Sequence, residues 1–70
     1  MAPDWIERLL ADPDAPIDTV MRVVRGKGLN VVINAMFDEG TRVQHRDPER
    51  ALACVTLIER IQAHTKTRKP

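Results

Sequence analysis

The stretch Leu-Asn-Val-Val-Ile-Asn-Ala-Met-Phe, residues 29–37, decides how the rest of the chain must be arranged. At about 100° per residue, its apolar side chains cover most of the circumference of a helix. Only Asn30, Asn34 and the following Asp38 form a narrow polar strip. A helix that is apolar on nearly every side must be packed on several sides, so we expect a central apolar helix over residues 29–39, ending at Gly40.

A short first helix is predicted to begin at Pro3 and Asp4, because proline fits the first helical turn and an early carboxylate interacts well with the helix dipole. It must end near Asp12, since Pro13 disfavours helical geometry in the residue before it. The prolines of residues 12–16 then make a stiff corner. The apolar stripe of this helix consists of Trp5, Ile6, Leu9 and Leu10.

Residues 17–25 form a second predicted helix, capped by Asp14 or Asp18 and ended by Gly26, which is placed to take the left-handed conformation. A β-hairpin over residues 20–33 is the alternative, because β-branched residues favour strands and a glycine-rich connector suits a turn. We prefer two helices, since the apolar residues of the central stretch fit helical spacing while a strand would place them on both faces.

The clearest local signal is Asp-Pro-Glu at residues 47–49, which combines a capping acid with a proline and a second acid in the first helical turn. The helix that it opens is predicted to extend to about His64, with Arg50 and Arg60 in solvent. Residues 65–70 carry basic side chains and no apolar one, which predicts a disordered tail. The apolar face of this last helix consists of Ala51, Cys54, Val55, Ile58 and Ile61, widened by Leu52 and Leu57.

Together these patterns predict an all-α fold of three to four helices, with a single domain over residues 1–64 and a basic tail over residues 65–70. A chain of 70 residues lies near the lower limit for a self-sufficient core. Domains of this size usually gain the missing stability from disulfides, metal ions or oligomerisation. Cys54 is the only cysteine, so an internal disulfide is impossible, and we expect self-association or a protein partner.

The net charge of +1 conceals a gradient along the chain. Residues 1–20 contain five acidic and one basic side chain, whereas residues 41–70 contain seven basic and three acidic ones. This layout suits head-to-tail packing, or contact of one end with a polyanion. No apolar run approaches the ~20 residues that span a bilayer, and a lone cysteine without a signal-like start argues against secretion. We therefore expect a cytoplasmic protein with no membrane contact.

No group of residues has catalytic or metal-binding spacing. His64 would lie about 15 Å from Cys54 along one helix at 1.5 Å per residue, too far to act as its base. The spacings among His45, Cys54 and His64 match none of the short pairs that build zinc sites. Asp38 and Glu39 diverge by about 100° on a helix, so we expect them to solubilise its end. We expect no enzyme, no cofactor, no metal and no small-molecule substrate.

Protein binding is the function that the pattern favours, because the chain has more apolar helix surface than so short a domain can hide. It would be an adaptor, an inhibitor or an assembly subunit that also forms homo-oligomers. For the first helix, docking to a groove on another protein competes with folding back over the domain's own core. The expected contact residues are the apolar anchors Trp5, Leu9, Val31 and Ala35.

A helix-turn-helix DNA-binding regulator that uses residues 17–39 is the alternative. Asn30 and Asn34 share a face of the central helix, and asparagine can pair with adenine through two hydrogen bonds. Asp38 and Glu39 argue against this function, since they would face the DNA backbone. The side chains expected at phosphates are Arg22, Arg25, Lys27 and Arg42.

Overall fold

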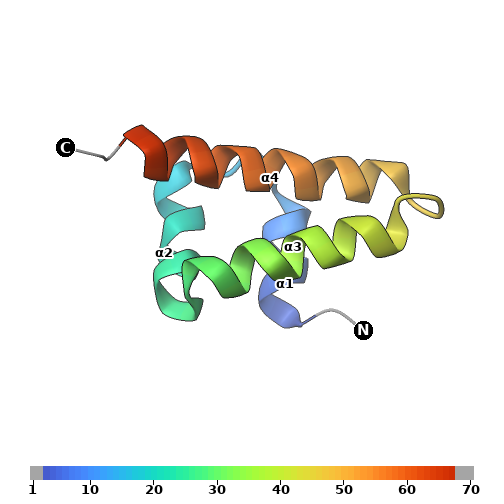
Figure 1. The fold of residues 1–70 in the computed structure, drawn as a ribbon, viewed down its shortest axis with the longest axis horizontal. Helices are drawn as coiled ribbons and strands as arrows, with labels where there is room; N and C mark the ends of the chain where they lie inside the picture. The colour runs from blue at the N-terminus through green and yellow to red at the C-terminus, as the bar shows by residue number, and fades with distance from the viewer. Residues whose placement is uncertain (1–2, 68–70) are drawn as a thin grey trace.

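The computed structural model describes residues 3–67, which form four α-helices (Figure 1). These are α1 (Asp4–Ala11), α2 (Ile17–Lys27), α3 (Leu29–Val43) and α4 (Pro48–Thr67). No strand occurs within the described residues. The predicted all-α fold is confirmed, and the alternative hairpin over residues 20–33 is excluded.

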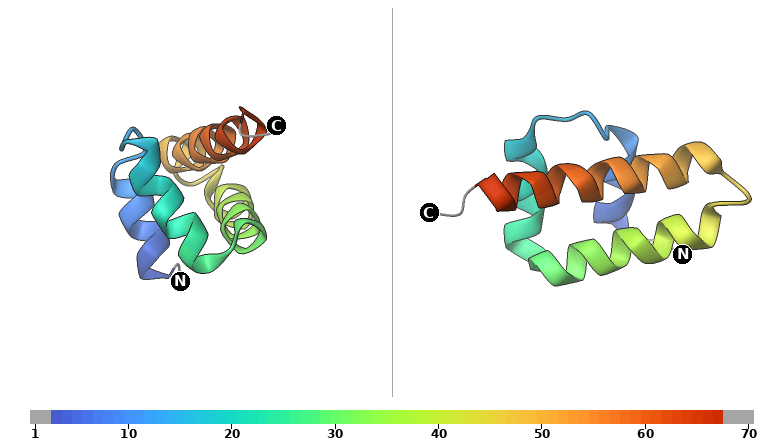
Figure 2. Two further views of the ribbon diagram at one scale, coloured as in Figure 1. Left: turned by 90° about the vertical axis from the view of Figure 1, so that its left-hand side faces the viewer. Right: turned by 45° about the horizontal axis from the view of Figure 1, so that its top comes forward.

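The longest helices, α3 and α4, run antiparallel and pack against each other along the length of the molecule. The shorter helices, α1 and α2, lie together on one side of this α3–α4 hairpin (Figure 2, left). Both contact α4, and α2 also contacts α3. In the described part of the chain no helix covers the opposite side of the hairpin.

All four helices contribute to one core. In α1, Ile6 and Leu9 are buried, so this helix folds back over the domain's own core. The pattern that places them inside is the three- to four-residue spacing of apolar side chains along each helix. The remaining core residues are Val20, Met21 and Val24 of α2, Val32 and Met36 of α3, and Cys54, Leu57 and Ile61 of α4.

The helix α3 is covered on only part of its circumference. Val32 and Met36 are fully buried, but Val31 and Phe37 are exposed by 54% and 67%, and Leu29 also lies at the surface. This differs from the central position expected for residues 29–39, because short α1 and α2 pack on the same side of the hairpin and leave its other side open. Three large apolar side chains of α3 therefore face solvent.

The two glycines that were predicted to end helices lie inside them, at Gly26 in α2 and Gly40 in α3. The chain turns instead at Gly28, which alone separates α2 from α3 and has a φ of 103°. Its N–H donates to the carbonyl oxygen of Val24 at 2.7 Å. Gly40 has a packing role, since a Cβ there would lie 3.3 Å from the Cβ of Cys54.

The start of α4 agrees with the sequence, because the Arg50 N–H donates to Oδ1 of Asp47 at 3.1 Å. Neither Asp14 nor Asp18 caps α2, whose N-cap position is occupied by Pro16. The end of α4 lies beyond His64, so residues 65–67 of the predicted tail are helical. The rest of that tail lies outside the described residues.

The proline corner between α1 and α2 is held by Arg60 of α4. Its Nη1 donates to the carbonyl oxygen of Pro13 and its Nη2 to that of Ala15, each at 2.6 Å. The prediction that Arg60 is a solvent-facing charge was wrong, because two carbonyl groups of the corner lack helical partners and point toward its guanidinium.

Candidate protein-binding surface

Three large apolar side chains remain exposed on the open side of the hairpin: Phe37 of α3 and Leu52 and Val55 of α4, at 67%, 66% and 48%. We call these residues the Phe37 face. On α4, Leu52 lies roughly 140° from Leu57 around the helix axis, and on α3 Phe37 lies roughly 140° from Val32. Since Leu57 and Val32 belong to the core that α1 and α2 cover, the Phe37 face points away from both helices.

A hollow of about 150 Å³ lies between α3 and α4 at this face. Phe37 and Val55 form part of its wall, and the buried Met36 and Cys54 lie beside them. Gly40 also lines the hollow, where the absence of a side chain lets the two helices approach. The remaining lining residues are Thr41, Gln44, Ala51 and Ile58, so the hollow is lined by apolar and neutral polar side chains only.

The thiol of Cys54 has no exposed surface. Burial raises the pKa of this thiol, and the negative charge of Glu39 raises it further. The neutral thiol is a poor nucleophile, because the thiolate is the reactive form. Cys54 therefore acts as a small apolar side chain at the contact with Gly40.

Behind the hollow, the buried carboxylate of Glu39 joins α3 to α4. Nε of Arg50 donates to its Oε2 at 2.8 Å, and Nη2 of Arg42 donates to its Oε1. Burial alone would favour the neutral acid, but the hydrogen bonds from both guanidinium groups outweigh it and lower the pKa of Glu39. The prediction that Glu39 solubilises the end of a helix was wrong, because this position faces α4 rather than solvent.

Arg50 extends the same network to α1, since its Nη1 and Nη2 donate to Oε1 and Oε2 of Glu7 at 3.2 and 2.7 Å. These hydrogen bonds to Glu7, together with those to Glu39, raise the pKa of Arg50. One guanidinium therefore connects three helices, where the sequence had suggested a solvent-facing charge. The fork geometry of arginine allows this, because several N–H donors of fixed direction serve two carboxylates.

The predicted anchors do not form one exposed surface. Leu9 belongs to the core, so it is not part of an exposed surface. Trp5 and Ala35 are half-buried against the core, and Val31 alone is exposed. Val31 also lies roughly 120° around α3 from Phe37, which separates it from the Phe37 face.

The spacing of apolar residues in the sequence indicates two opposite apolar sides of α4, but not which of them is exposed. Leu52 cannot share a stripe with Ile61, because nine residues place them roughly 180° apart on a helix. Ile61 is buried and Leu52 is exposed, as that spacing requires. Which of the two faced the core depended on where α1 and α2 pack, and the sequence did not specify that.

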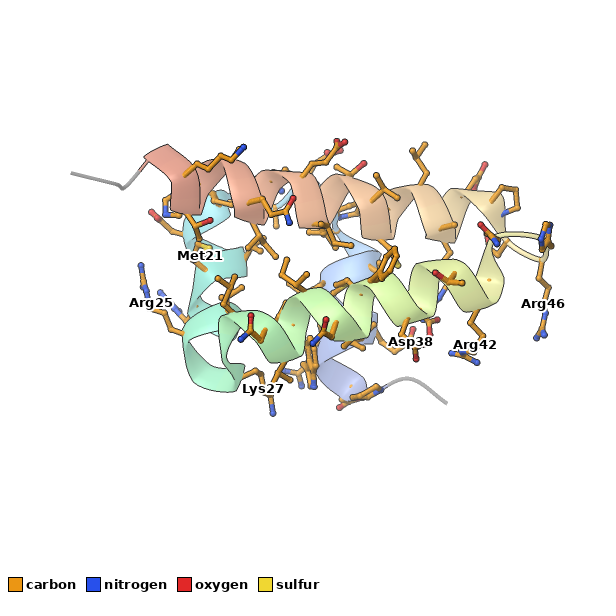
Figure 3. All side chains as sticks on the ribbon, in the orientation of Figure 1. Met21, Arg25, Lys27, Asp38, Arg42 and Arg46 are labelled. Atoms are coloured by element: carbon orange, nitrogen blue, oxygen red, sulfur yellow. The ribbon has the colours of Figure 1, made fainter. Side chains whose placement is uncertain are left out.

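The residues predicted to contact DNA are exposed but do not form one continuous positive surface. Asn30 and Asn34 lie at the surface of α3. Figure 3 shows Arg25 and Lys27 near one end of the hairpin and Arg42 near the other, with Asp38 between them. Arg42 is also hydrogen-bonded to Glu39, which reduces its availability for a phosphate. Arg22, the remaining candidate for a phosphate contact, is exposed on α2.

Among residues 3–67, no group of three or more histidine, cysteine, aspartate and glutamate side chains is placed to hold a metal ion. The helices of this region lack the combination of length and apolar character that crossing a membrane requires. Comparison of the chain with models of known protein families, with curated protein sequences and with solved structures gave no match.

Proposed function

We propose that this chain is a small non-catalytic binding module that presents apolar helix surface to another protein. The observation that carries the proposal is the Phe37 face, where exposed apolar side chains border a hollow with a neutral lining. Apolar surface of this kind, surrounded by polar residues, is typical of protein interaction sites. Aromatic side chains, phenylalanine included, are enriched at protein interfaces.

Burial of the Phe37 face against a partner would favour binding. Complete burial of one large apolar side chain stabilises a complex by about 1.5–3 kcal/mol. Phe37 and Leu52 each have about two-thirds of their surface exposed, and a partner could bury this surface. The neutral lining offers no attraction for a phosphate backbone or an acidic peptide. The chemistry therefore favours an apolar surface as the partner.

Site-specific photo-crosslinking tests the proposal in cells that express the full chain. A benzophenone amino acid replaces Phe37 in one variant and Arg22, an exposed residue of α2, in a matched control. We expect discrete protein adducts from position 37, lost when Val55→Glu is added, and none of those adducts from position 22. Equal adduct patterns from both positions would contradict the proposal.

A DNA-binding regulator is the second candidate function, and the exposure of Asn30 and Asn34 near the start of α3 favours it. Figure 1 shows α2 and α3 at a steep angle to each other, as helices of a helix-turn-helix are. This function predicts duplex binding that weakens steeply with salt and, in Asn34→Ala, weakens further on one sequence only. Duplex binding that is absent at low salt would exclude it.

A further inference from the structure

We infer that the partner of the Phe37 face is a second copy of this chain, packed about a twofold axis so that Phe37 of each copy occupies the hollow of the other. The inference rests on the proposed function and names its partner. It is carried by the shape of the face, by the neutral lining of the hollow, by the extent of the open side of the hairpin and by the length of the chain.

The shape of the face is self-complementary. In a twofold interface the same surface must supply both the projecting group and its receptor. The Phe37 face has both, since Phe37 projects with 67% of its surface exposed beside a hollow of about 150 Å³. An enclosed cavity of about 150 Å³ accepts benzene, so the hollow, which is open to solvent, has the volume of one phenyl ring.

The neutral lining of the hollow permits close approach of two identical copies. None of the side chains that line the hollow is charged, so a twofold axis here brings no like charges together at its centre. The net charge of +1 per chain adds little repulsion between the copies. A strongly charged partner would find no complementary group in the hollow.

The open side of the α3–α4 hairpin is large enough for a stable dimer. The molecule measures 40 × 20 × 19 Å, and the α3–α4 hairpin occupies one of its long sides. Such a side spans roughly 800 Å², which is about the area that each partner of a standard interface contributes, so a stable dimer would use this whole side and not the Phe37 face alone. A small domain whose single cysteine is buried and unpaired is also of the kind that usually gains stability by oligomerisation.

The test is the molecular mass of the purified full chain in solution, measured by sedimentation over a wide concentration range. We expect the wild type to reach twice 7.9 kDa. Val55→Glu places a charge at the wall of the hollow and should weaken the dimer at least tenfold, and Phe37→Ser should do the same by removing the projecting ring. Val31→Glu, on an equally exposed position of α3 outside the Phe37 face, is the matched control and should remain dimeric.

Helical content measured by circular dichroism shows that each variant is folded. A wild type that stays monomeric at every concentration overturns the inference, and so does a dimer that Val31→Glu disrupts while Val55→Glu does not. Photo-crosslinking then distinguishes failure of the dimer from failure of the binding module. A monomeric chain whose Phe37 adducts contain a different protein refutes the second copy and supports the binding module, whereas a monomer without adducts contradicts both.

Discussion

Gly28 is the residue on which the connection between α2 and α3 depends. Its φ of 103° and ψ of 137° lie in a region that is accessible almost only to glycine. Gly28→Ala should therefore lower the free energy of unfolding by about 1–3 kcal/mol, measured by urea denaturation. Gly26→Ala is the matched control, because Gly26 is helical and a Cβ there meets no atom within 4 Å. It should raise the stability by about 0.5–1 kcal/mol, and a loss of stability would contradict the assignment.

Glu39 makes stability depend on pH. Its pKa is lowered from 4.5 in the folded protein, so its stabilisation is fully present above that ordinary value and is lost as the pH falls through the folded value. We expect Glu39→Gln to lower the free energy of unfolding by about 2 kcal/mol at pH 7. This is less than the loss on breaking a fully buried ion pair, because Arg50 is partly exposed and keeps its bonds to Glu7.

The check is the free energy of unfolding measured from pH 7 to pH 3. The wild type should lose stability below about pH 4.5 more steeply than Glu39→Gln. Glu7→Gln is the control at the other end of Arg50, and its loss should stay below about 1 kcal/mol because the Glu7 side chain is half exposed. Parallel pH profiles for the wild type and Glu39→Gln would show that Glu39 is not the acid-sensitive group.

Sequence patterns identified residues with local roles and missed those whose partners are distant in the chain. The cap at Asp47 was predictable because its partner is the N–H of Arg50, three residues away. The ion pair of Arg50 with Glu7 spans 43 residues and depends on the packing of α1 against α4. Gly40 was misread as a helix end for the same reason, since its function appears only when α4 is beside it.

At the scale of the elements, Arg60 links the longest helix to the corner that orients α1 and α2. We expect Arg60→Lys to lower the free energy of unfolding by about 1–2 kcal/mol, because one ammonium cannot reproduce both bonds of the guanidinium fork to Pro13 and Ala15. Chemical denaturation measures this loss. Arg22→Lys, on the exposed surface of α2, should change stability by less than about 0.5 kcal/mol. Equal effects of the two substitutions would show that Arg60 does not stabilise the proline corner.

The four helices themselves were largely predictable, because proline and apolar spacing are local signals. Pro13 and Pro48 mark the end of α1 and the start of α4. The ends of α2 and α3 were displaced by a few residues, since a glycine can close a helix or continue it. Tertiary packing decides between these two outcomes, and it placed the turn at Gly28 rather than Gly26.

For the whole molecule, the second copy inferred above makes stability depend on protein concentration. Because a dimer unfolds to separate chains, mass action should raise the Tm by a few degrees for each tenfold increase in concentration. Thermal denaturation of the wild type at several concentrations measures the dependence. At high concentration, Val55→Glu should have a lower Tm than the wild type, and its Tm should depend very little on protein concentration. A wild-type Tm that is independent of concentration would contradict dimerisation.

The surplus of apolar helix was predictable at this scale, but its location was not. The sequence pattern placed the contact at Val31, Ala35, Leu9 and Trp5, whereas the structure exposes Phe37, Leu52 and Val55 together. Each helix has apolar residues on more than one side, and composition alone does not state which side its neighbours cover. That choice follows from the docking of α1 and α2 on one side of the hairpin.

The one-residue connection at Gly28 affects whether two chains can exchange helices by domain swapping. If Gly28 became helical, residues 17–43 would form a single rod of about 40 Å, and the N-terminal helices would swing away from their own α4. The surface of α4 that α1 and α2 had covered could then bind α1 and α2 of a neighbouring chain. Such an exchange is domain swapping through a hinge. The positive φ of Gly28 thus lets α2 fold back against α3 and α4 of its own chain.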